Sequence, residues 1–517
     1  MKPATSRRGL AVLLATIVGS SMSMIDGTAV NVALPALQRD FEASAAQLQW
    51  VVEGYAVVLA ALILLGGALG DRFGRRLVFA IGIAVFALAS IACGFAPNIE
   101  TLIAARCVQG LGGALATPGS LALISASFDG AERGRAIGTW SGFSAITSAL
   151  GPVLGGWLVQ IASWRLVFFI NVPLAALVFV ALGRGVAESR DDAAPRRLDL
   201  LGATLATAGL AALVYGLIAL QGAVAASRTT ALVAIAAGVV ALAAFVIAER
   251  FERSPMLRLA LFRSRTFSLT NGYTFLLYGA LGGSLYFVPF DAIDVQHYTP
   301  AAAGAVMLPL IALIFGASRW SGGLVARTGP RLPLVLGAVV SAAGFLLFAT
   351  IGTGKPYVTS FLPAVLVLGA GLALLVAPLT TSVMDAVDAS HAGIASAVNN
   401  AVSRAAGLIA IALFGIVLAA VFERSFFDGA AIRSASLTSA TVAVLSRARA
   451  ILVAGHVPPA VHEPRQRAAV QRQLDRAYAR GFAAVMLSSA ALCLGAALLA
   501  LLIAAPRGSP AAAPVAG

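Results

Sequence analysis

Charged side chains are scarce in this sequence. Asp, Glu, Lys and Arg make up 11% of its 517 residues, whereas 59% of the residues are apolar. Soluble domains carry about 25% charged residues, and a soluble fold of this size needs them to cover its surface. The shortage therefore excludes a soluble globular protein and indicates a chain that lies mostly in lipid.

Cysteine and histidine are also rare, with three and four residues. Cys93, Cys107 and Cys493 lie inside apolar runs, where we expect packing residues and not a disulfide framework or a metal site. The chain has no HExxH motif, no G-x-S-x-G turn and no paired histidines, and its glycine runs lack the strand–turn–helix context of a nucleotide site. These absences argue against a membrane enzyme, and we predict no metal and no cofactor.

Long apolar runs separated by short polar connections fill most of the chain. A helix needs about 20 apolar residues to span the hydrocarbon core, and runs this uniform do not fit the alternating strands of a membrane barrel. The first run continues past residue 25 without a cleavage site, so we interpret it as a spanning helix and not as a secretion signal. The sequence predicts fourteen helices, at 10–35, 49–70, 77–96, 100–124, 135–160, 163–183, 199–219, 230–248, 267–290, 302–326, 333–351, 359–384, 396–423 and 480–504.

The basic residues indicate an orientation. The formal net charge is +14, and the arginines lie mostly between apolar runs, which is typical of topology signals and not of a nucleic-acid surface. If the N-terminus is cytoplasmic, the cytoplasmic connections hold most arginines, while the short external loops hold Arg39, Arg165, Arg228 and Lys355. The long basic segment 424–479 falls outside, and loops of that length translocate with little regard to charge. We therefore predict that both termini are cytoplasmic.

An internal repeat divides the chain. Residues 67–76 (GALGDRFGRR) follow the second predicted helix and residues 322–331 (GGLVARTGPR) follow the tenth, both with the pattern G-x-L-x-(D/A)-R-x-G-x-R. Repeated halves are the usual build of secondary transporters. We predict an all-α membrane fold with a six-helix bundle at 1–190, a two-helix insert with its linkers at 191–262, and a second six-helix bundle at 263–517 that includes the external loop 424–479.

Six motifs in order resemble the major facilitator superfamily, and within it the fourteen-helix drug:proton antiporters of the EmrB/QacA type. The resemblance covers nearly the whole chain. It rests on residues 25–35 (IDGTAVNVALP), 67–76, 106–110 (RCVQG), 151–156 (GPVLGG), 164–173 (WRLVFFINVP) and 391–400 (HAGIASAVNN). The resemblance implies two six-helix bundles that alternate access to a central cavity, and export of small molecules in exchange for protons.

Charged residues inside the apolar runs are the strongest candidates for proton coupling. Asp26 lies in the middle of the first helix with Asn31 further along it, Glu53 lies near the outer end of the second, and Arg106 lies in the fourth. A charge at the bilayer centre costs at least about 2.5–3.5 kcal/mol, so it should face a polar cavity and have a partner. We favour Asp26 as the coupling acid and Glu53 as a local addition. The alternative for Asp26 is a static ion pair with Arg106.

Two motifs are candidates for conformational control. The first is the turn formed by Gly67, Asp71, Arg72, Gly74, Arg75 and Arg76, which we interpret as an ionic latch, the alternative being a simple positive-inside anchor. The repeat has Ala326 in place of the acid, so any latch is asymmetric. The second is formed by Gly151, Pro152, Gly155 and Gly156 in the fifth helix. Small residues and a missing backbone hydrogen bond let a neighbouring helix approach closely and let the helix bend. In the resembled family this is the antiporter motif, and the alternative is ordinary small-residue packing.

The second half offers weaker candidates. Asn399, Asn400 and Arg404 open the thirteenth helix and either line the substrate cavity or cap the helix. Asp291 and Asp294 lie at the outer end of the ninth helix, as cavity acids or as solvated loop residues. Arg319 lies within the tenth helix, and His391 falls in a cytoplasmic loop without a predicted proton role. In the external loop, the basic stretch 465–476 is amphipathic and either lies on the membrane surface or caps the external vestibule.

The sequence thus predicts a proton-coupled multidrug or small-molecule exporter of the cytoplasmic membrane, powered by the proton gradient without a cofactor. The first alternative is a proton-coupled importer of a small metabolite on the same fold, against which the 151–156 motif argues. A channel is disfavoured because the chain repeats a loop motif and lacks a filter-like segment. The expected partners are a lipophilic small molecule and the lipid bilayer, with no nucleic acid. The sequence is compatible with a monomer and does not identify a protein partner.

Overall fold

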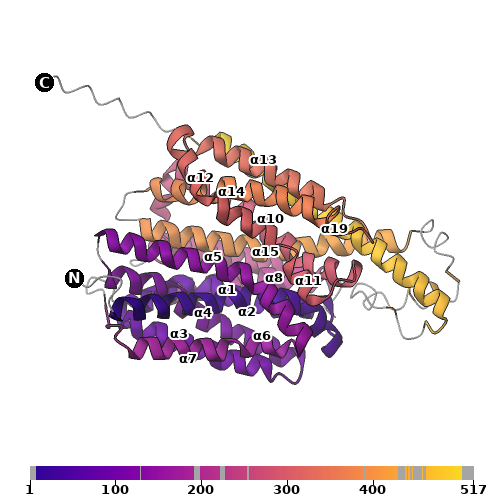
Figure 1. Cartoon of the computed structure of the whole chain (residues 1–517), viewed down its shortest axis with the longest axis horizontal. Coiled ribbons are helices and arrows are strands. Elements are labelled where there is room, and N and C mark those ends of the chain that lie inside the picture. The colour runs from indigo at the N-terminus through magenta and orange to yellow at the C-terminus, as the bar shows by residue number, and fades with distance from the viewer. Residues whose placement is uncertain are drawn as a thin grey trace.

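The computed structural model is helical, and its helices run along one common axis (Figure 1). It describes residues 7–128, 130–190, 198–221, 227–252, 255–387, 392–428, 437–438, 441–442, 445, 457 and 461–503. Within these residues fourteen helices are long and apolar enough to cross a membrane, and no strand is present. The predicted fold class and the fourteen spans are therefore confirmed.

The first bundle contains the helices up to residue 183. Several begin at a polar cap: Ser44 and Gln47 form a reciprocal capping box at the start of α2, and the Asn98 side chain accepts a hydrogen bond from the Thr101 backbone N–H at the start of α4. The elements are α1 (Arg7–Phe41), α2 (Ala45–Phe73), α3 (Arg75–Gly94), α4 (Ile99–Ser127), α5 (Gly130–Ile161), α6 (Arg165–Phe169) and α7 (Asn171–Gly183).

The second bundle contains the helices from residue 259 onward, above the first bundle in Figure 1. Its elements are η1 (Leu259–Arg263), α10 (Arg265–Phe290), the π-helical turn η2 (Asp291–Val295), α11 (Pro300–Ala305), α12 (Leu308–Thr328), α13 (Arg331–Phe348), α14 (Phe361–Asp385), α15 (Ala392–Phe426) and α19 (Pro464–Leu501). The predicted helix 302–326 is divided, because α11 ends at Ala305 and α12 begins at Leu308.

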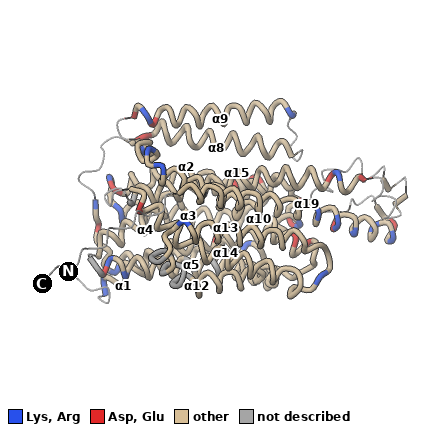
Figure 2. Tube along the Cα trace, turned by 90° about the horizontal axis from the view of Figure 1, so that it is seen from above, with Lys and Arg blue, Asp and Glu red and all other residues tan. Residues whose placement is uncertain are grey.

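Two further helices, α8 (Leu200–Ala219) and α9 (Arg228–Phe251), form the predicted insert. Figure 2 shows them beside the bundles, with α9 outermost. One apolar cluster joins α8 to both halves: Val214 and Ile218 of α8 pack in it with Val57 of α2 and Ala412 of α15. The insert therefore lies against the interface between the two bundles. The predicted domain boundaries stay a prediction.

The last two helices extend beyond the rest of the molecule on one side (Figures 1 and 2). Helix α19 begins at Pro464, well before the predicted start at 480, so part of the predicted external loop is a continuation of the spanning helix. Phe422 and Phe426 of α15 pack there against Val470 and Leu474 of α19. The basic residues of the stretch 465–476 lie on the exposed side of this helix.

Charged residues gather at the two ends of the helices and leave a broad apolar middle, as Figure 2 shows. This distribution matches a bilayer with water on both sides. Large apolar side chains such as Leu88, Val240 and Leu498 are exposed along the outer faces, where lipid takes the place of a protein neighbour. The molecule is a multi-pass membrane protein.

Candidate functional site

A cavity of about 1020 Å³ lies between the two bundles. Ser23 and Thr28 of α1 and Tyr55 of α2 line it from the first bundle, and Asn400 and Arg404 of α15 line it from the second. It reaches the α2–α3 turn and the segments that flank the insert, where the lining includes Asp71, Arg75, Asp199 and Arg258. These are predicted cytoplasmic positions, so the cavity opens toward the predicted cytoplasmic end.

The opposite end of the cavity is closed by a contact between α5 and α11. Gly156 lies against the backbone carbonyl of Pro300, and Gly304 lies against the backbone carbonyl of Pro152, so neither glycine leaves room for a Cβ atom. The Gln160 side chain also accepts a hydrogen bond of 3.3 Å from the Ala301 backbone N–H. Glycines at a helix crossing allow the backbones to approach closely. The two bundles therefore meet tightly at the predicted external end.

The other glycines of the 151–156 motif face the first helix. Gly151 lies against the Thr28 side chain, and Gly155 lies against Ala29. One face of α5 thus packs on α1 and another contacts the second bundle. The motif joins three helices around the closed end of the cavity.

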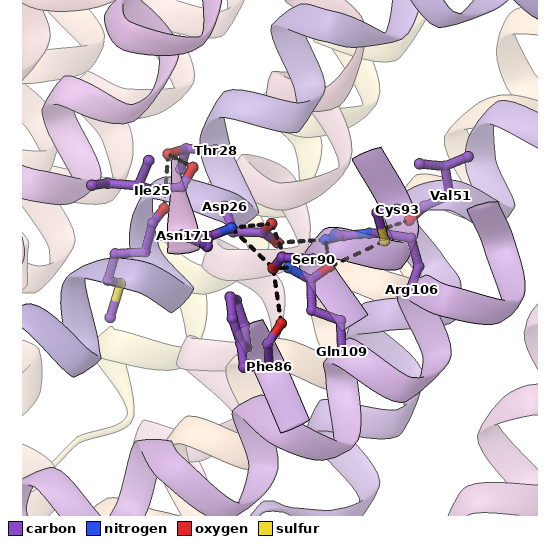
Figure 3. A network of polar contacts seen from close by, with 11 residues as sticks. Ile25, Asp26, Thr28, Val51, Phe86, Ser90, Cys93, Arg106, Gln109 and Asn171 are labelled. Atoms are coloured by element: carbon purple, nitrogen blue, oxygen red, sulfur yellow. Dashed lines mark hydrogen bonds and ion pairs between the residues drawn. The ribbon is translucent and has the colours of Figure 1, made fainter. Parts of the chain in front are cut away.

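Asp26 lies at the centre of a fully buried polar network (Figure 3). Its carboxylate is paired with the Arg106 guanidinium, and it accepts hydrogen bonds from the amide groups of Gln109 (2.8 Å) and Asn171 (3.4 Å). Both amides also donate to the hydroxyl of Ser90, at 2.8 and 3.2 Å. The network joins α1, α3, α4 and α7 and satisfies both carboxylate oxygens.

Arg106 makes further contacts besides its pairing with Asp26. Its Nε donates to the Val51 backbone carbonyl at 2.9 Å, and its guanidinium lies 4.3 Å from the ring centre of Tyr55 and 5.8 Å from that of Phe168. Cation–π contacts of this kind add stability where water is excluded. The structure therefore brings Asp26 and Arg106 together as a buried, hydrogen-bonded pair, and whether this pair persists through the transport cycle stays a prediction. Gln109 and Asn171 had no predicted role, and Ser90 was not predicted at all, because a buried serine carries no sequence signal.

Glu53 has different surroundings. Its side chain is fully buried, yet neither carboxyl oxygen has a hydrogen-bond partner among the residues that the structure describes. It interacts electrostatically with the phenol of Tyr286 on α10. Asn31 is similar to Glu53 in one respect, because its buried Oδ1 atom also lacks a partner within the described chain.

A second, smaller cavity of about 70 Å³ lies at the predicted external end. Two acids line it, Asp294 in the π-helical turn and Asp475 on α19. Gln49 and Tyr286 line it from α2 and α10. Gln49 precedes Glu53 by one helical turn and Tyr286 interacts electrostatically with Glu53, so two residues of this lining are neighbours of Glu53, which does not itself line the cavity. Gln221, directly after α8, donates to the Gln49 side chain at 3.0 Å and to the Ala412 carbonyl at 3.2 Å, which ties the insert to both bundles.

Asp291 lies next to this cavity but does not line it. Its side chain is 1% exposed, one oxygen accepts a hydrogen bond of 3.3 Å from Gln296, and the other has no partner among the described residues. Both acids of the π-helical turn are therefore placed between α10 and α19 and not in a fully solvated loop.

The comparison with protein families decides the classification, because residues 16–411 match the model of the Major Facilitator Superfamily. The chain belongs to the Major Facilitator Superfamily. The predicted family is thereby confirmed. The crystal structure of a bacterial homologue of the human lysosomal transporter Spinster, described as inward-facing and unoccupied, superimposes with a TM-score of 0.65 at 17% identity, covering 98% of this chain and 100% of the other.

Relatives with higher identity are named for drug resistance. The multidrug resistance protein Stp of Mycobacterium tuberculosis is 38% identical over 417 residues, which cover 80% of this chain and 77% of the relative. The tetracenomycin C resistance and export protein of Streptomyces glaucescens is 33% identical, with 81% and 78% of the two chains covered. The methylenomycin A resistance protein of Bacillus subtilis is 34% identical, with 81% and 89% covered. Within the superfamily, the chain is therefore a member of the drug-efflux group.

The predicted latch of this superfamily member lies on one bundle. Asp71 pairs with Arg75 at 2.8 Å across the α2–α3 turn, and both residues line the central cavity. Arg72 is exposed beside the Phe73 ring, 4.9 Å from its centre, and Gly67 packs against Pro118 of α4. The structure brings the predicted latch residues together at one turn, and their role as a latch stays a prediction.

Glu188, which the sequence did not indicate, holds this turn in place. Its carboxylate accepts hydrogen bonds of 3.0 Å from the backbone N–H groups of Arg76 and Leu77 at the start of α3. Gly74 has a φ of 123° and lies directly over this carboxylate, so a side chain at Gly74 would displace it. An acid at a helix N-terminus satisfies free N–H groups and complements the helix dipole.

The candidates in the second bundle separate into two groups. Asn400 and Arg404 line the central cavity, whereas Asn399 points toward α10 and donates to Asn271 at 3.1 Å and to Thr274 at 2.7 Å. Of the remaining candidates, the side chain of Arg319 and residue His391 lie outside the described residues.

Proposed function

We propose that this protein exports small lipophilic molecules from the cytoplasm or the inner leaflet across the cytoplasmic membrane, in exchange for protons. The observation that carries the proposal is the central cavity, about 1020 Å³ in volume, which is reached from one end and closed at the other by the α5–α11 contact. The drug-resistance names of its relatives support the direction of transport. In this orientation both termini are cytoplasmic.

Glu53 is the group that we propose to carry the proton. A buried carboxylate without a hydrogen-bond donor is costly, so this side chain is most stable as a neutral acid in the conformation described. Asp26 lacks this freedom, because protonating it would break its pairing with a buried arginine. The geometry therefore favours Glu53 over Asp26 as the acid that gains and loses a proton, in contrast to the preference expressed from the sequence.

The small external cavity offers Glu53 a route to the outside. Besides Asp294 and Asp475, its lining includes the polar side chains of Gln49 and Gln471, and a buried water needs such hydrogen-bond partners. Proton uptake from outside would neutralise Glu53 and favour the return to the open-inward conformation. One charge crossing 100 mV supplies about 2.3 kcal/mol, which is enough for a gradient of roughly fifty-fold.

An accumulation assay tests the proposal. The protein is expressed in a bacterium that lacks its own exporters. The cells are loaded with tetracenomycin C, methylenomycin A, puromycin or lincomycin, because four relatives are named for resistance to these compounds. We expect lower accumulation of at least one compound, and restored accumulation when a protonophore collapses the proton gradient. The Glu53→Gln substitution should restore accumulation of the compound in the same way as the protonophore does.

The matched control is Glu100→Gln, since Glu100 lies at the exposed start of α4 and, among the described residues, its side chain accepts a single hydrogen bond, from Gln47. We expect cells with the Glu100→Gln variant to accumulate as little of the compound as cells with the unaltered exporter. Unchanged accumulation of all four compounds in cells with the unaltered protein would contradict export, and higher accumulation would indicate the importer alternative.

A further inference from the structure

Arg404 places a positive charge in the lining of the central cavity, and no described residue forms an ion pair with it. It lies on α15 twelve residues from the start of that helix, which is about 18 Å along the helix axis at 1.5 Å per residue. Its side chain lines the cavity and has neither an ion pair nor a hydrogen bond with any residue that the structure describes. A guanidinium keeps its proton under all physiological conditions, so this charge is permanent.

The other charged groups of the cavity lining lie near its mouth. Asp71 and Arg75 neutralise each other at the α2–α3 turn, and Asp199 caps the start of α8 by accepting a hydrogen bond of 2.7 Å from the Gly202 N–H. Arg258 lies in the exposed segment before η1. Among the described lining residues, Arg404 is therefore the one charged side chain in the deep part of the cavity.

The buried Asp26–Arg106 pair does not balance the charge of Arg404. Tyr55 separates the two sites: its ring lies against Arg106, and its phenol interacts electrostatically with Arg404 and with Asp26. The Asp26 carboxylate is already neutralised by Arg106 and fully hydrogen-bonded. The deep cavity thus presents one net positive charge, and apolar residues such as Met24 and Trp140 share its lining.

We propose that Arg404 makes the cavity select amphipathic aromatic molecules with an anionic group, a carboxylate or a phenolate, over lipophilic cations. This inference names the substrate class of the proposed exporter and rests on that function. A guanidinium binds a carboxylate through two parallel hydrogen bonds, and these are strongest where water is scarce. A cation in the same place would meet like charge without a screening acid. The rest of the lining supplies the apolar contact area that a drug-sized molecule needs.

Two dyes with one ring system and opposite charge test the selectivity. Fluorescein is an anion and rhodamine 123 a cation at neutral pH, and both contain the same three-ring xanthene. Binding to the purified protein in lipid nanodiscs is measured by fluorescence anisotropy, with empty nanodiscs as the blank. We expect the unaltered protein to bind fluorescein about tenfold more tightly than rhodamine 123, which is a difference of about 1.4 kcal/mol.

Variants at two arginines of the lining provide the comparison. Arg404→Gln should bring the affinity ratio close to one, with weaker fluorescein and tighter rhodamine 123 binding, and the gain for rhodamine 123 shows that the variant is folded. Arg404→Lys should keep a preference for the anion. Arg258→Gln removes the same charge from the exposed mouth and should leave the ratio unchanged, since water screens that position.

Three results would overturn the inference: a wild-type preference for rhodamine 123, no specific fluorescein binding, or an Arg404→Gln variant with the wild-type ratio. Failure of the proposed function would look different. A protein that binds fluorescein through Arg404 but lowers the accumulation of no compound in cells would keep the substrate class and lose the role as exporter.

Discussion

Two buried acids in the first bundle have opposite surroundings, and this difference predicts opposite responses to substitution. Asp26→Asn leaves Arg106 buried without its counter-charge, and breaking a buried ion pair in this way costs about 3–5 kcal/mol. Glu53→Gln removes no hydrogen bond between described residues. We therefore expect Asp26→Asn to lower the thermal unfolding temperature in detergent clearly, and Glu53→Gln to leave it nearly unchanged while proton-coupled efflux is lost.

The double variant Asp26→Asn/Arg106→Gln is the control for this prediction. Removing both charges should recover part of the stability that the single variant loses, because no unpaired charge remains in the interior. An Asp26→Asn protein as stable as the unaltered one would show that the Asp26–Arg106 pair does not hold the bundle together. Asp26 would then again be the preferred candidate for proton coupling.

At single positions, sequence reasoning found the charges and gave the Asp26–Arg106 pair as one alternative, but it missed the uncharged hydrogen-bond partners. Asp26, Arg106 and Glu53 stand out because a charge in an apolar run is costly wherever it lies. Whether such a charge is static depends on the groups that surround it in space, and Ser90 and Glu188 come from distant segments. No spacing rule connects residues 26, 90, 109 and 171, so the assignment of roles needed the structure.

At the scale of helices, the contact between α5 and α11 controls the closed end. A methyl group on Gly156 would collide with the Pro300 carbonyl, so Gly156→Ala should weaken this closure and favour an outward-open conformation. A single cysteine in place of Ala419, which lines the external cavity, should then react faster with a membrane-impermeant maleimide, in a background without the three native cysteines. Gly142→Ala on the same helix is the control, because a Cβ there has no neighbour within 4 Å. Equal labelling of both variants would show that Gly156 does not hold the closed end.

The helices themselves were predictable where length and hydropathy decide. All fourteen spans were expected, because a run of about 20 apolar residues has few alternatives to a membrane helix. Local breaks were not predicted: the interruption between α11 and α12 around Val306 lies inside an apolar run. Its sequence signal is Pro309, which has no backbone N–H for the carbonyl of Ala305 and was not used to divide the predicted helix. The early start of α19 was missed for the opposite reason, since its first two turns are polar and are stabilised by packing on α15.

At the scale of the whole molecule, alternating access requires that the two bundles separate at the predicted external end. The Ala301 backbone N–H donates to the Gln160 side chain across this contact, with one residue from each bundle. We therefore expect a Gln160→Cys/Ala301→Cys pair to form a disulfide in the conformation described. Oxidation should then stop efflux by locking the open-inward state, and a reducing agent should restore efflux.

The control is a Gln47→Cys/Glu100→Cys pair. These two side chains also meet near the external end but belong to one bundle, so their cross-link should leave efflux unchanged. If cells with the fully oxidised Gln160–Ala301 pair exported as fast as reduced cells, transport would not need this interface to open, and movement of the bundles about the central cavity would have to be abandoned as the mechanism.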